Sequence, residues 1–472
     1  MNHTIQTFQQ LYHKSAECLG WPSLKLRHIR HSVGADGYLA TCRGGELEIT
    51  AGTPLGLSYG LAQNTTALRS GYREEFLGPR TPHFSLRPLF LSGAESFDPA
   101  RIIELGYNCV IVESDQTPIP ENLDGLLLGR KVCVSHPIRK PMDAGYRKAL
   151  EHEVEAKASS HILFYESQLL HPSFESERAT TLDLVSAELA LVESLMPKTT
   201  QLIFYVPALL AEWLPALCDV AGDRTKIAFS NKAAIWEVLR KQKDPSVTPL
   251  MPLLRMSMGR GLWPSLPLAR IDRTIGRMFG SNFAGMIVCV SHVPIGDGPL
   301  AASLWIAGQA QWQRQSATYL AEAWFAAYRP DLKYSDHSSL FSSAEMVDTE
   351  LTRLTDADVY PAGRIEIALA NLRHIDYWLQ THENSHTPMS SLGDYFRYFV
   401  RDAWCLLYYH IDRLRISVQG APMALDHHGG FWAALNTGGG SRCIPTAATV
   451  KPLDIARVIP EEPRMSLIFQ EN

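Results

Sequence analysis

Charged side chains stand at the ends of a series of short apolar segments in this sequence, where they could act as acids, bases or ligands. Where strands alternate with helices, polar residues at the carboxyl ends of the strands gather at one edge, and carboxylates there suit general acid–base catalysis. Strand-end positions and nearby aromatic residues therefore supply the candidates. The catalytic candidates are Glu166, Asp297, Glu113 and Asp115, and the substrate-binding candidates are Glu95, His136, Asn231, Arg255, Trp263, His292 and Trp305.

Glu166 is the most distinctive of these candidates. It follows the apolar segment 161–165 and is next to the aromatic residue Tyr165 in the sequence. This sequence context predicts a partly desolvated carboxyl, which suits a general acid. Arg255 and His136 could bind a carboxylate on a substrate. Trp263 and Trp305 could offer flat faces to sugar rings, although tryptophans in such positions are more often part of a core.

One short motif matches a serine nucleophile. Gly56–Gly60 fits G-x-S-x-G, which in hydrolases places a serine on a tight turn between a strand and a helix. Here Thr53 and Pro54 separate the strand from the motif, so Ser58 is predicted to lie in the first turn of the helix. The motif therefore indicates packing more than catalysis.

A second motif matches a zinc site. His382-Glu383-Asn384-Ser385-His386 fits H-E-x-x-H, which would put two imidazoles on one face of a helix and leave a zinc peptidase as an alternative function. Asn384 and Ser385 are polar where a buried zinc helix is apolar, and Pro388 ends a helix. The sequence therefore predicts no metal and no cofactor.

The apolar segments that carry the candidates number eight. They do not alternate apolar with polar residues, which is typical of strands covered on both faces by helices. Eight such strands over about 220 residues favour a (β/α)8 TIM barrel over an open doubly wound sheet. The predicted strands are 87–93, 108–114, 131–136, 161–167, 201–206, 225–231, 249–257 and 284–292.

The remaining sequence divides into three further parts. Residues 1–82 predict a small α+β domain with helices near 4–19 and 57–69 and strands near 24–30, 37–42 and 46–51, and residues 83–300 predict the barrel. Residues 301–418 predict a helical region, and residues 419–472 a loop-rich extension. The predicted fold class is therefore α/β, with the barrel between two smaller parts.

Composition narrows the choice of partners and compartment. The 472 residues are 46% hydrophobic and 20% charged, with 44 basic and 49 acidic residues and a net charge of −5. This balance argues against nucleic acid or an anionic membrane as a partner. The eight cysteines are scattered without a C-x-x-C pair, and the N-terminus lacks the apolar core of a secretory signal, so we expect a cytoplasmic protein.

Three segments resemble parts of known glycoside hydrolases. Glu46–Gln63 resembles the small domain that precedes the barrel in α-glucuronidases and β-N-acetylhexosaminidases, in which a strand leads into a glycine turn and a helix with a Tyr-Gly-Leu step. The segments 304–312 and 316–324 resemble the helical region that follows the barrel in α-glucuronidases. The resemblance implies that Gly56, Tyr59 and Gly60 are packing residues and that the protein is a glycoside hydrolase.

The resemblance also directs the choice of mechanism. Hexosaminidases of this type carry an adjacent Asp-Glu pair after the fourth strand, whereas this chain has only Glu166 there. We therefore expect Glu166 to be the general acid, with Asp297, Glu113 or Asp115 as the second carboxylate, acting on a uronic acid or another modified sugar. The alternative is a catalytically inactive barrel that binds carbohydrate or serves as a scaffold.

One C-terminal segment suggests assembly. Residues 394–415 carry more apolar surface than one core-facing stripe of a helix buries. Either the preceding helix and the tail cover the surplus, or a second subunit does. We expect a homodimer through the C-terminal helices.

Overall fold

The computed structural model describes most of the chain up to Glu383. The described residues fall into two compact units, of which the first contains the N-terminal sheet and the barrel and the second contains the last two long helices. The described residues are 3–29, 36–71, 77–92, 96–134, 143–167, 182–241, 249–256, 266–279, 282–291, 299–330, 332–355, 362–383, 396, 399, 400, 403 and 407.

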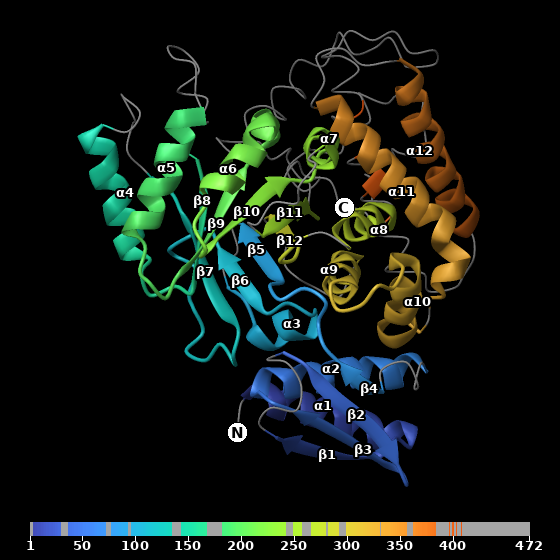
Figure 1. The fold of residues 1–472 in the computed structure, drawn as a ribbon. Helices are drawn as coiled ribbons and strands as arrows, with labels where there is room; N and C mark the ends of the chain where they lie inside the picture. Colours follow the sequence, from blue (N-terminus) through green and yellow to red (C-terminus); the bar gives the residue numbers. More distant parts are fainter. Residues whose placement is uncertain are drawn as a thin grey trace. The chain divides into compact units, whose positions relative to one another are not determined.

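The N-terminal domain is a four-stranded mixed sheet with two helices (Figure 1). Its strand order is β1-β3-β2-β4, in which β1 and β3 are parallel and the other pairs are antiparallel. The predicted α+β domain is therefore confirmed, with one short strand that the sequence did not predict. The elements are α1 (His3–Leu19), β1 (Ser23–His28), β2 (Tyr38–Arg43), β3 (Glu46–Ala51), α2 (Pro54–Ser70) and β4 (Gly78–Arg80).

Helix α2 packs closely on this sheet because it carries glycines. The Thr53 side chain accepts a hydrogen bond from the Gly56 N–H and so caps the helix. A Cβ on Gly60 would lie 2.5 Å from Ile49 of the sheet, so only glycine allows this approach. Ser58 is fully buried and its hydroxyl donates to the Pro54 carbonyl. The motif around Ser58 is thus a packing motif.

The second domain is a closed barrel of eight parallel strands, as the sequence predicts (Figure 1). Strand β12 pairs with β5 and closes the barrel, which excludes the open sheet. The strands are β5 (Pro88–Ser92), β6 (Cys109–Val112), β7 (Leu127–Val132), β8 (Ile162–Glu166), β9 (Gln201–Val206), β10 (Thr225–Ser230), β11 (Leu250–Arg255) and β12 (Ile287–Ser291).

Alternate residues of the strands point inward and fill the barrel. Because side chains alternate along a strand, the inward register continues upward from these core residues. The inward set includes Phe90, Cys109, Ile111, Ile162, Phe164, Ile203, Tyr205, Ala228, Met251, Leu253, Ile287 and Cys289. The barrel is therefore a packed core, and a site can form only above it.

Helices cover the barrel wall, and two of them begin at aspartate caps. Asp98 caps α3, and Asp143 caps α4. One connection differs from the usual pattern: residues 113–126, between β6 and β7, contain no helix. The helices are α3 (Pro99–Glu104), α4 (Ala144–Ala156), α5 (Leu182–Leu195), the 3-10 helix η3 (Ala208–Trp213), α6 (Leu214–Val220), α7 (Ala233–Lys241) and α8 (Leu268–Met278).

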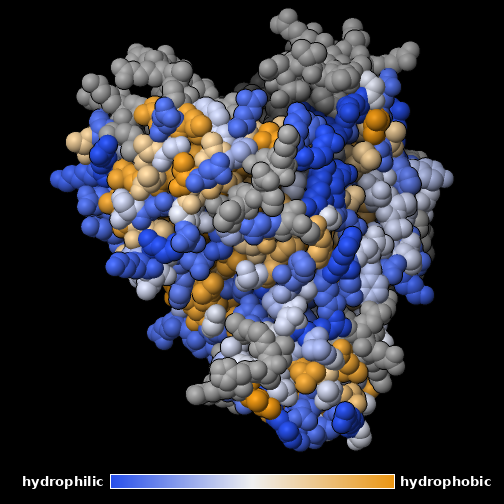
Figure 2. All heavy atoms as spheres, in the orientation of Figure 1, coloured by the Kyte–Doolittle hydropathy of each residue, from blue (hydrophilic) through white to orange (hydrophobic). Residues whose placement is uncertain are grey.

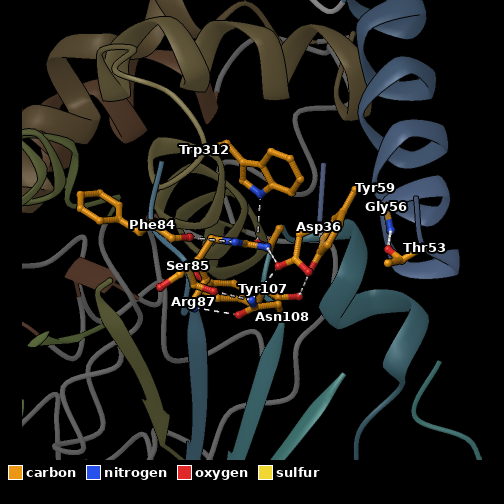
Figure 3. Close-up of polar contacts among 11 residues, drawn as sticks. Asp36, Thr53, Gly56, Tyr59, Phe84, Ser85, Arg87, Tyr107, Asn108 and Trp312 are labelled. Carbon is orange, nitrogen blue, oxygen red and sulfur yellow. Dashed lines mark hydrogen bonds and ion pairs between the residues drawn. The ribbon is translucent and has the colours of Figure 1, made fainter. Parts of the chain in front are cut away.

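A buried arginine joins the N-terminal domain to the floor of the barrel (Figure 3). Arg87 is fully buried, and its guanidinium bonds Asp36 at 2.9 Å and the carbonyls of Gly106 and Phe84. It also lies over the Trp312 ring, 4.8 Å from the centroid. Although a buried charge can mark a reactive site, this guanidinium is held by carbonyls and a carboxylate at the amino ends of the strands. That end of the fold serves stability.

Helices follow the barrel, as predicted. Helices α9 (Pro299–Ala310) and α10 (Ala317–Tyr328) precede α11 (Tyr334–Thr355) and α12 (Ala362–Glu383), which pack on each other in the second unit. Phe396 is buried there against Phe341 and Trp378, so the preceding helices cover part of the apolar stripe. The homodimer stays a prediction.

The surface of the described residues is mixed. Hydrophilic side chains are spread over the face drawn in Figure 2, with apolar side chains between them. The large apolar side chains that are exposed belong to several separate elements, including Leu19, Val220 and Tyr377. Among the helices that the structure describes, none is both long and apolar enough to cross a membrane.

Candidate active site

Polar side chains form a ring at the carboxyl end of the barrel, directly above the packed core. Each one continues the inward register of its strand, and Glu113 extends β6 by donating its backbone N–H to the carbonyl of Leu91. We call this set the mouth ring. Its members are Ser92, Glu113, Lys131, Glu166, Tyr205, Ser230 and Arg255.

One ammonium group connects the two glutamates of the mouth ring. Lys131 Nζ lies 2.8 Å from Glu113 Oε1 and 3.5 Å from Glu166 Oε2. The Ser92 hydroxyl donates to the other carboxylate oxygen of Glu113. Because the lysine side chain is 17% exposed and the glutamates are 32% and 40% exposed, Lys131 lies deeper and the carboxylates face the mouth.

The carboxylates also determine the charge state of Lys131. Burial alone would lower the pKa of its ammonium group, but the hydrogen bond to Glu113 and the charges of Glu113 and Glu166 outweigh burial and raise the pKa. Lys131 is therefore a permanent cation at neutral pH. It holds the two carboxylates in a fixed place and offsets part of their mutual repulsion.

The opposite side of the mouth ring carries a second cation. Arg255 ends β11, is exposed, and hydrogen-bonds the Tyr205 side chain, which also bonds Ser230. Burial raises the pKa of the Tyr205 hydroxyl above its ordinary value, so the hydroxyl stays protonated. Arg255 continues the inward register of Met251 and Leu253, and its charge interacts with that of Glu166.

Three of the sequence candidates lie away from the mouth ring. Asp115 lies outside the barrel wall, where it pairs with Arg130, an outward-facing residue of β7, and with Lys157. The Asn231 amide bonds Thr274 and the Trp236 indole, so it joins α7 to α8. Trp305 is 1% exposed, and its indole is part of the core.

The other candidates are not in the described part of the chain. Glu95, His136, Trp263, His292 and Asp297 lie outside the described residues, and so do His386 and the side chains of His382 and Glu383. Among the residues that the structure does describe, no three His, Cys, Asp or Glu side chains are grouped so that they could hold a metal ion.

Sequence reasoning missed the residue at the centre of the ring, Lys131. The sequence placed the third strand at 131–136, whereas β7 covers Leu127–Val132, so Lys131 is near the carboxyl end of its strand and not at its start. The period-two pattern of Leu127, Gly129 and Lys131 is the signal that would have found it. Tyr205 was not identified as a site residue because, in the sequence, it resembles the other apolar residues of its strand.

Comparison with known proteins supports the fold. No protein-family model matches the chain, and no curated protein matches it. A solved GH138 enzyme targeting pectin rhamnogalacturonan II is similar with a TM-score of 0.57 and 7% identity, over 87% of this chain and 68% of that one.

Other similar structures are GH20 enzymes. The β-N-acetylhexosaminidase from Streptomyces coelicolor A3(2) has a TM-score of 0.45 and 11% identity, over 68% of this chain and 90% of that one. The exo β-N-acetylglucosaminidase from Vibrio harveyi has a TM-score of 0.44 and 10% identity, over 70% and 72%. The resemblance to glycoside hydrolases is thus confirmed at the level of the fold: the chain has a TIM-barrel layout that it shares with the GH138 enzyme.

Proposed function

We propose that the protein is a glycoside hydrolase whose reaction takes place at the mouth ring. The observation that carries this proposal is the arrangement of Glu113 and Glu166 on either side of Lys131, with both carboxylates facing the mouth. Glycosidic bonds are hydrolysed by such pairs of carboxylates, and active sites of this fold lie at the carboxyl ends of the strands.

Glu113 is the carboxylate that stays ionised. It accepts hydrogen bonds from the Lys131 ammonium and the Ser92 hydroxyl, and both donors favour and orient the charged form. An oriented anion suits attack on the anomeric carbon or the stabilisation of positive charge there. Of the three residues considered for the second carboxylate, Glu113 is in the mouth ring and Asp115 lies outside the barrel wall, whereas Asp297 is outside the described residues.

Glu166 is the general acid. It is the more exposed glutamate and the one farther from Lys131, so it is the better placed to carry a proton to the leaving oxygen. The Glu113 and Glu166 oxygens that face Lys131 are no more than about 6.3 Å apart, because both distances are measured to the same nitrogen. Retaining pairs of carboxyl groups stand ~5–5.5 Å apart and inverting pairs ~6.5–9.5 Å apart, and a bound on one pair of oxygens is met by both, so the configuration of the product is to be measured.

Arg255 supports an acidic sugar as the substrate. An exposed guanidinium above an apolar barrel core offers paired donors that match a carboxylate. The similar GH138 enzyme is described as targeting pectin rhamnogalacturonan II, which makes pectin-derived glycosides the first class to test. The substrate we propose is therefore a glycoside of a uronic acid.

The test is hydrolysis of 4-nitrophenyl glycosides by the full chain, with α- and β-uronides beside the neutral sugars of the same configuration. We expect cleavage of one uronide, and proton NMR of the anomer that forms first assigns the reaction as retaining or inverting. Glu113→Gln should lower kcat by about 10⁴-fold. Asp115→Asn, two residues away but outside the barrel wall, should change kcat little. Equal loss in both variants would contradict the assignment of Glu113.

A further inference from the structure

A buried carboxylate lies just outside the barrel wall beside the mouth ring. Glu188 is on α5 and is fully buried, although its neighbours on the same helix face are the apolar residues Val185, Leu189 and Val192. A carboxylate is rarely buried in this way unless polar groups bond it. The hydrogen bonds that Glu188 accepts therefore indicate what it does.

Three hydroxyl groups converge on Glu188. The Tyr165 hydroxyl donates to Glu188 Oε1 at 2.7 Å, and the hydroxyl of Tyr146 donates to the same oxygen. The Ser167 hydroxyl donates to Oε2. The Tyr146 and Tyr165 hydroxyls lie 2.6 Å apart. Burial, reinforced by the charge of Glu188, raises the pKa of both tyrosines well above their ordinary value, so they remain donors.

Two of these three donors are the residues on either side of Glu166. Along β8 the side chains alternate, so Tyr165 and Ser167 point out of the barrel while Glu166 points in. We propose that Glu188 is a positioning residue for Glu166: by holding Tyr165 and Ser167 it fixes the backbone at the end of β8. This inference rests on the proposed function in so far as Glu166 is the general acid.

The contacts of Glu166 within the mouth ring show why such an anchor matters. Its distance to Lys131 is 3.5 Å, longer than a strong charge-assisted hydrogen bond, and its side chain is 40% exposed. The position of the backbone at the end of β8 therefore also determines where this carboxylate stands. A displacement of about 1 Å in a catalytic group can cost about 10²-fold in rate.

The experiment compares Glu188→Ala and Glu188→Gln with the wild type by hydrogen–deuterium exchange and by kinetics. Exchange decides the inference whether or not a substrate is known. We expect amides of residues 164–167 to exchange at least about tenfold faster in Glu188→Ala, with those of β6 and β10 unchanged. Glu188→Gln keeps a hydrogen-bonding group and should restore slow exchange. Unchanged exchange at 164–167 in Glu188→Ala would overturn the inference.

Kinetics separates positioning from simple stability. On the methyl glycoside of the uronic acid that the wild type cleaves, whose leaving oxygen needs a proton, Glu188→Ala should lower kcat about 10²-fold and leave KM within about threefold, with recovery in Glu188→Gln. Full kcat in folded Glu188→Ala would overturn the inference and leave the proposed function intact. A wild type that cleaves no glycoside would instead refute the proposed function, while exchange would still decide the role of Glu188.

Two further sets of variants complete the experiment: a matched control, and replacements for Glu188→Ala if that variant does not fold. Glu193→Ala on the same helix is the matched control, because Glu193 accepts hydrogen bonds from Gly222 and Thr225, which lie just before and at the start of β10 and not on β8. It should leave exchange at 164–167 unchanged. If Glu188→Ala does not fold, Tyr165→Phe and Ser167→Ala each remove one anchor. Each should then show a smaller increase in exchange at the same amides, and wild-type exchange in both would overturn the inference.

Discussion

Lys131 Nζ donates a 2.8 Å hydrogen bond to Glu113 across two neighbouring barrel strands. The same nitrogen lies 3.5 Å from Glu166 on the strand at its other side. One cation thus connects the two carboxylates to which we assign the chemistry. The assignment depends on this connection, because two carboxylates near each other without a cation would resist ionising together.

Removing Lys131 should therefore impair catalysis more than folding. In Lys131→Met, Glu113 loses the donor that favours its ionised form, and we expect kcat/KM to fall about 10²-fold. Steady-state kinetics on the cleaved uronide measures this. Lys226→Met is the matched control, because Lys226 is on β10 at the other end of the barrel, where it bonds Gln201. Comparable losses in both variants would show a general effect on the barrel.

Arg255 should determine the preference for an acidic sugar. Arg255→Lys keeps the charge but loses the paired donors, so we expect a loss of about tenfold or more in kcat/KM on the uronide. The neutral sugar of the same configuration should be cleaved at the wild-type rate. The measurement is the ratio of the two kcat/KM values. An unchanged ratio would show that Arg255 does not bind the carboxylate of the sugar.

Arg87 should contribute to stability and not to the reaction. Arg87→Met removes one partner of a buried ion pair, leaves Asp36 without its guanidinium and takes one donor each from the carbonyls of Phe84 and Gly106, which typically costs about 3–5 kcal/mol. Urea-induced unfolding followed by tryptophan fluorescence measures the shift in the midpoint. Arg27→Met, which breaks the exposed pair with Glu48, should shift it by less than about 1 kcal/mol. A small shift for Arg87→Met would contradict the role given to the barrel floor.

Buried tyrosines should make the fold sensitive to alkali. Burial raises the pKa of Tyr12 to about 12 and those of a further set of tyrosines higher still. Their folded pKa values are above the unfolded value of about 10, so the stability they contribute is complete below pH 10 and is lost as pH rises beyond it. The further set comprises Tyr38, Tyr59, Tyr107, Tyr146, Tyr165 and Tyr328.

Absorbance of tyrosinate near 295 nm tests this expectation. At pH 11 the native protein should show clearly fewer ionised groups than its 17 tyrosines, and the rest should ionise only on unfolding. The urea midpoint should fall as pH rises from 10 to 12. Full ionisation of all the tyrosines in the folded state would contradict the burial of this set.

Much of the fold could be predicted because local signals agree with it. Eight apolar segments, Asp98 and Asp143 as helix caps and the glycine spacing of α2 each specify a local conformation that the barrel and the N-terminal sheet also require. The connection between β6 and β7 does not follow the strand–helix pattern. It contains no helix, and the strand after it begins at Leu127, four residues before the predicted start at Lys131.

The site could be predicted only in part, because its geometry depends on which strand residues point inward. Glu113 and Glu166 were found as strand ends, but nothing local distinguishes Glu113 from Asp115, which lies on the other side of the wall. Glu188 was missed because it reads as one charged residue of an amphipathic helix. Its position between Val185 and Leu189 on the apolar face was the available signal.

The central claim is that Glu166 donates the proton at the mouth ring, and the kinetics of Glu166→Gln test it most directly. On the uronide with a poor leaving group, such as a methyl glycoside, kcat should fall by about 10²–10⁴-fold. On the 4-nitrophenyl uronide, whose leaving group needs little protonation, the loss should be much smaller. Full activity of Glu166→Gln on both substrates would contradict the account.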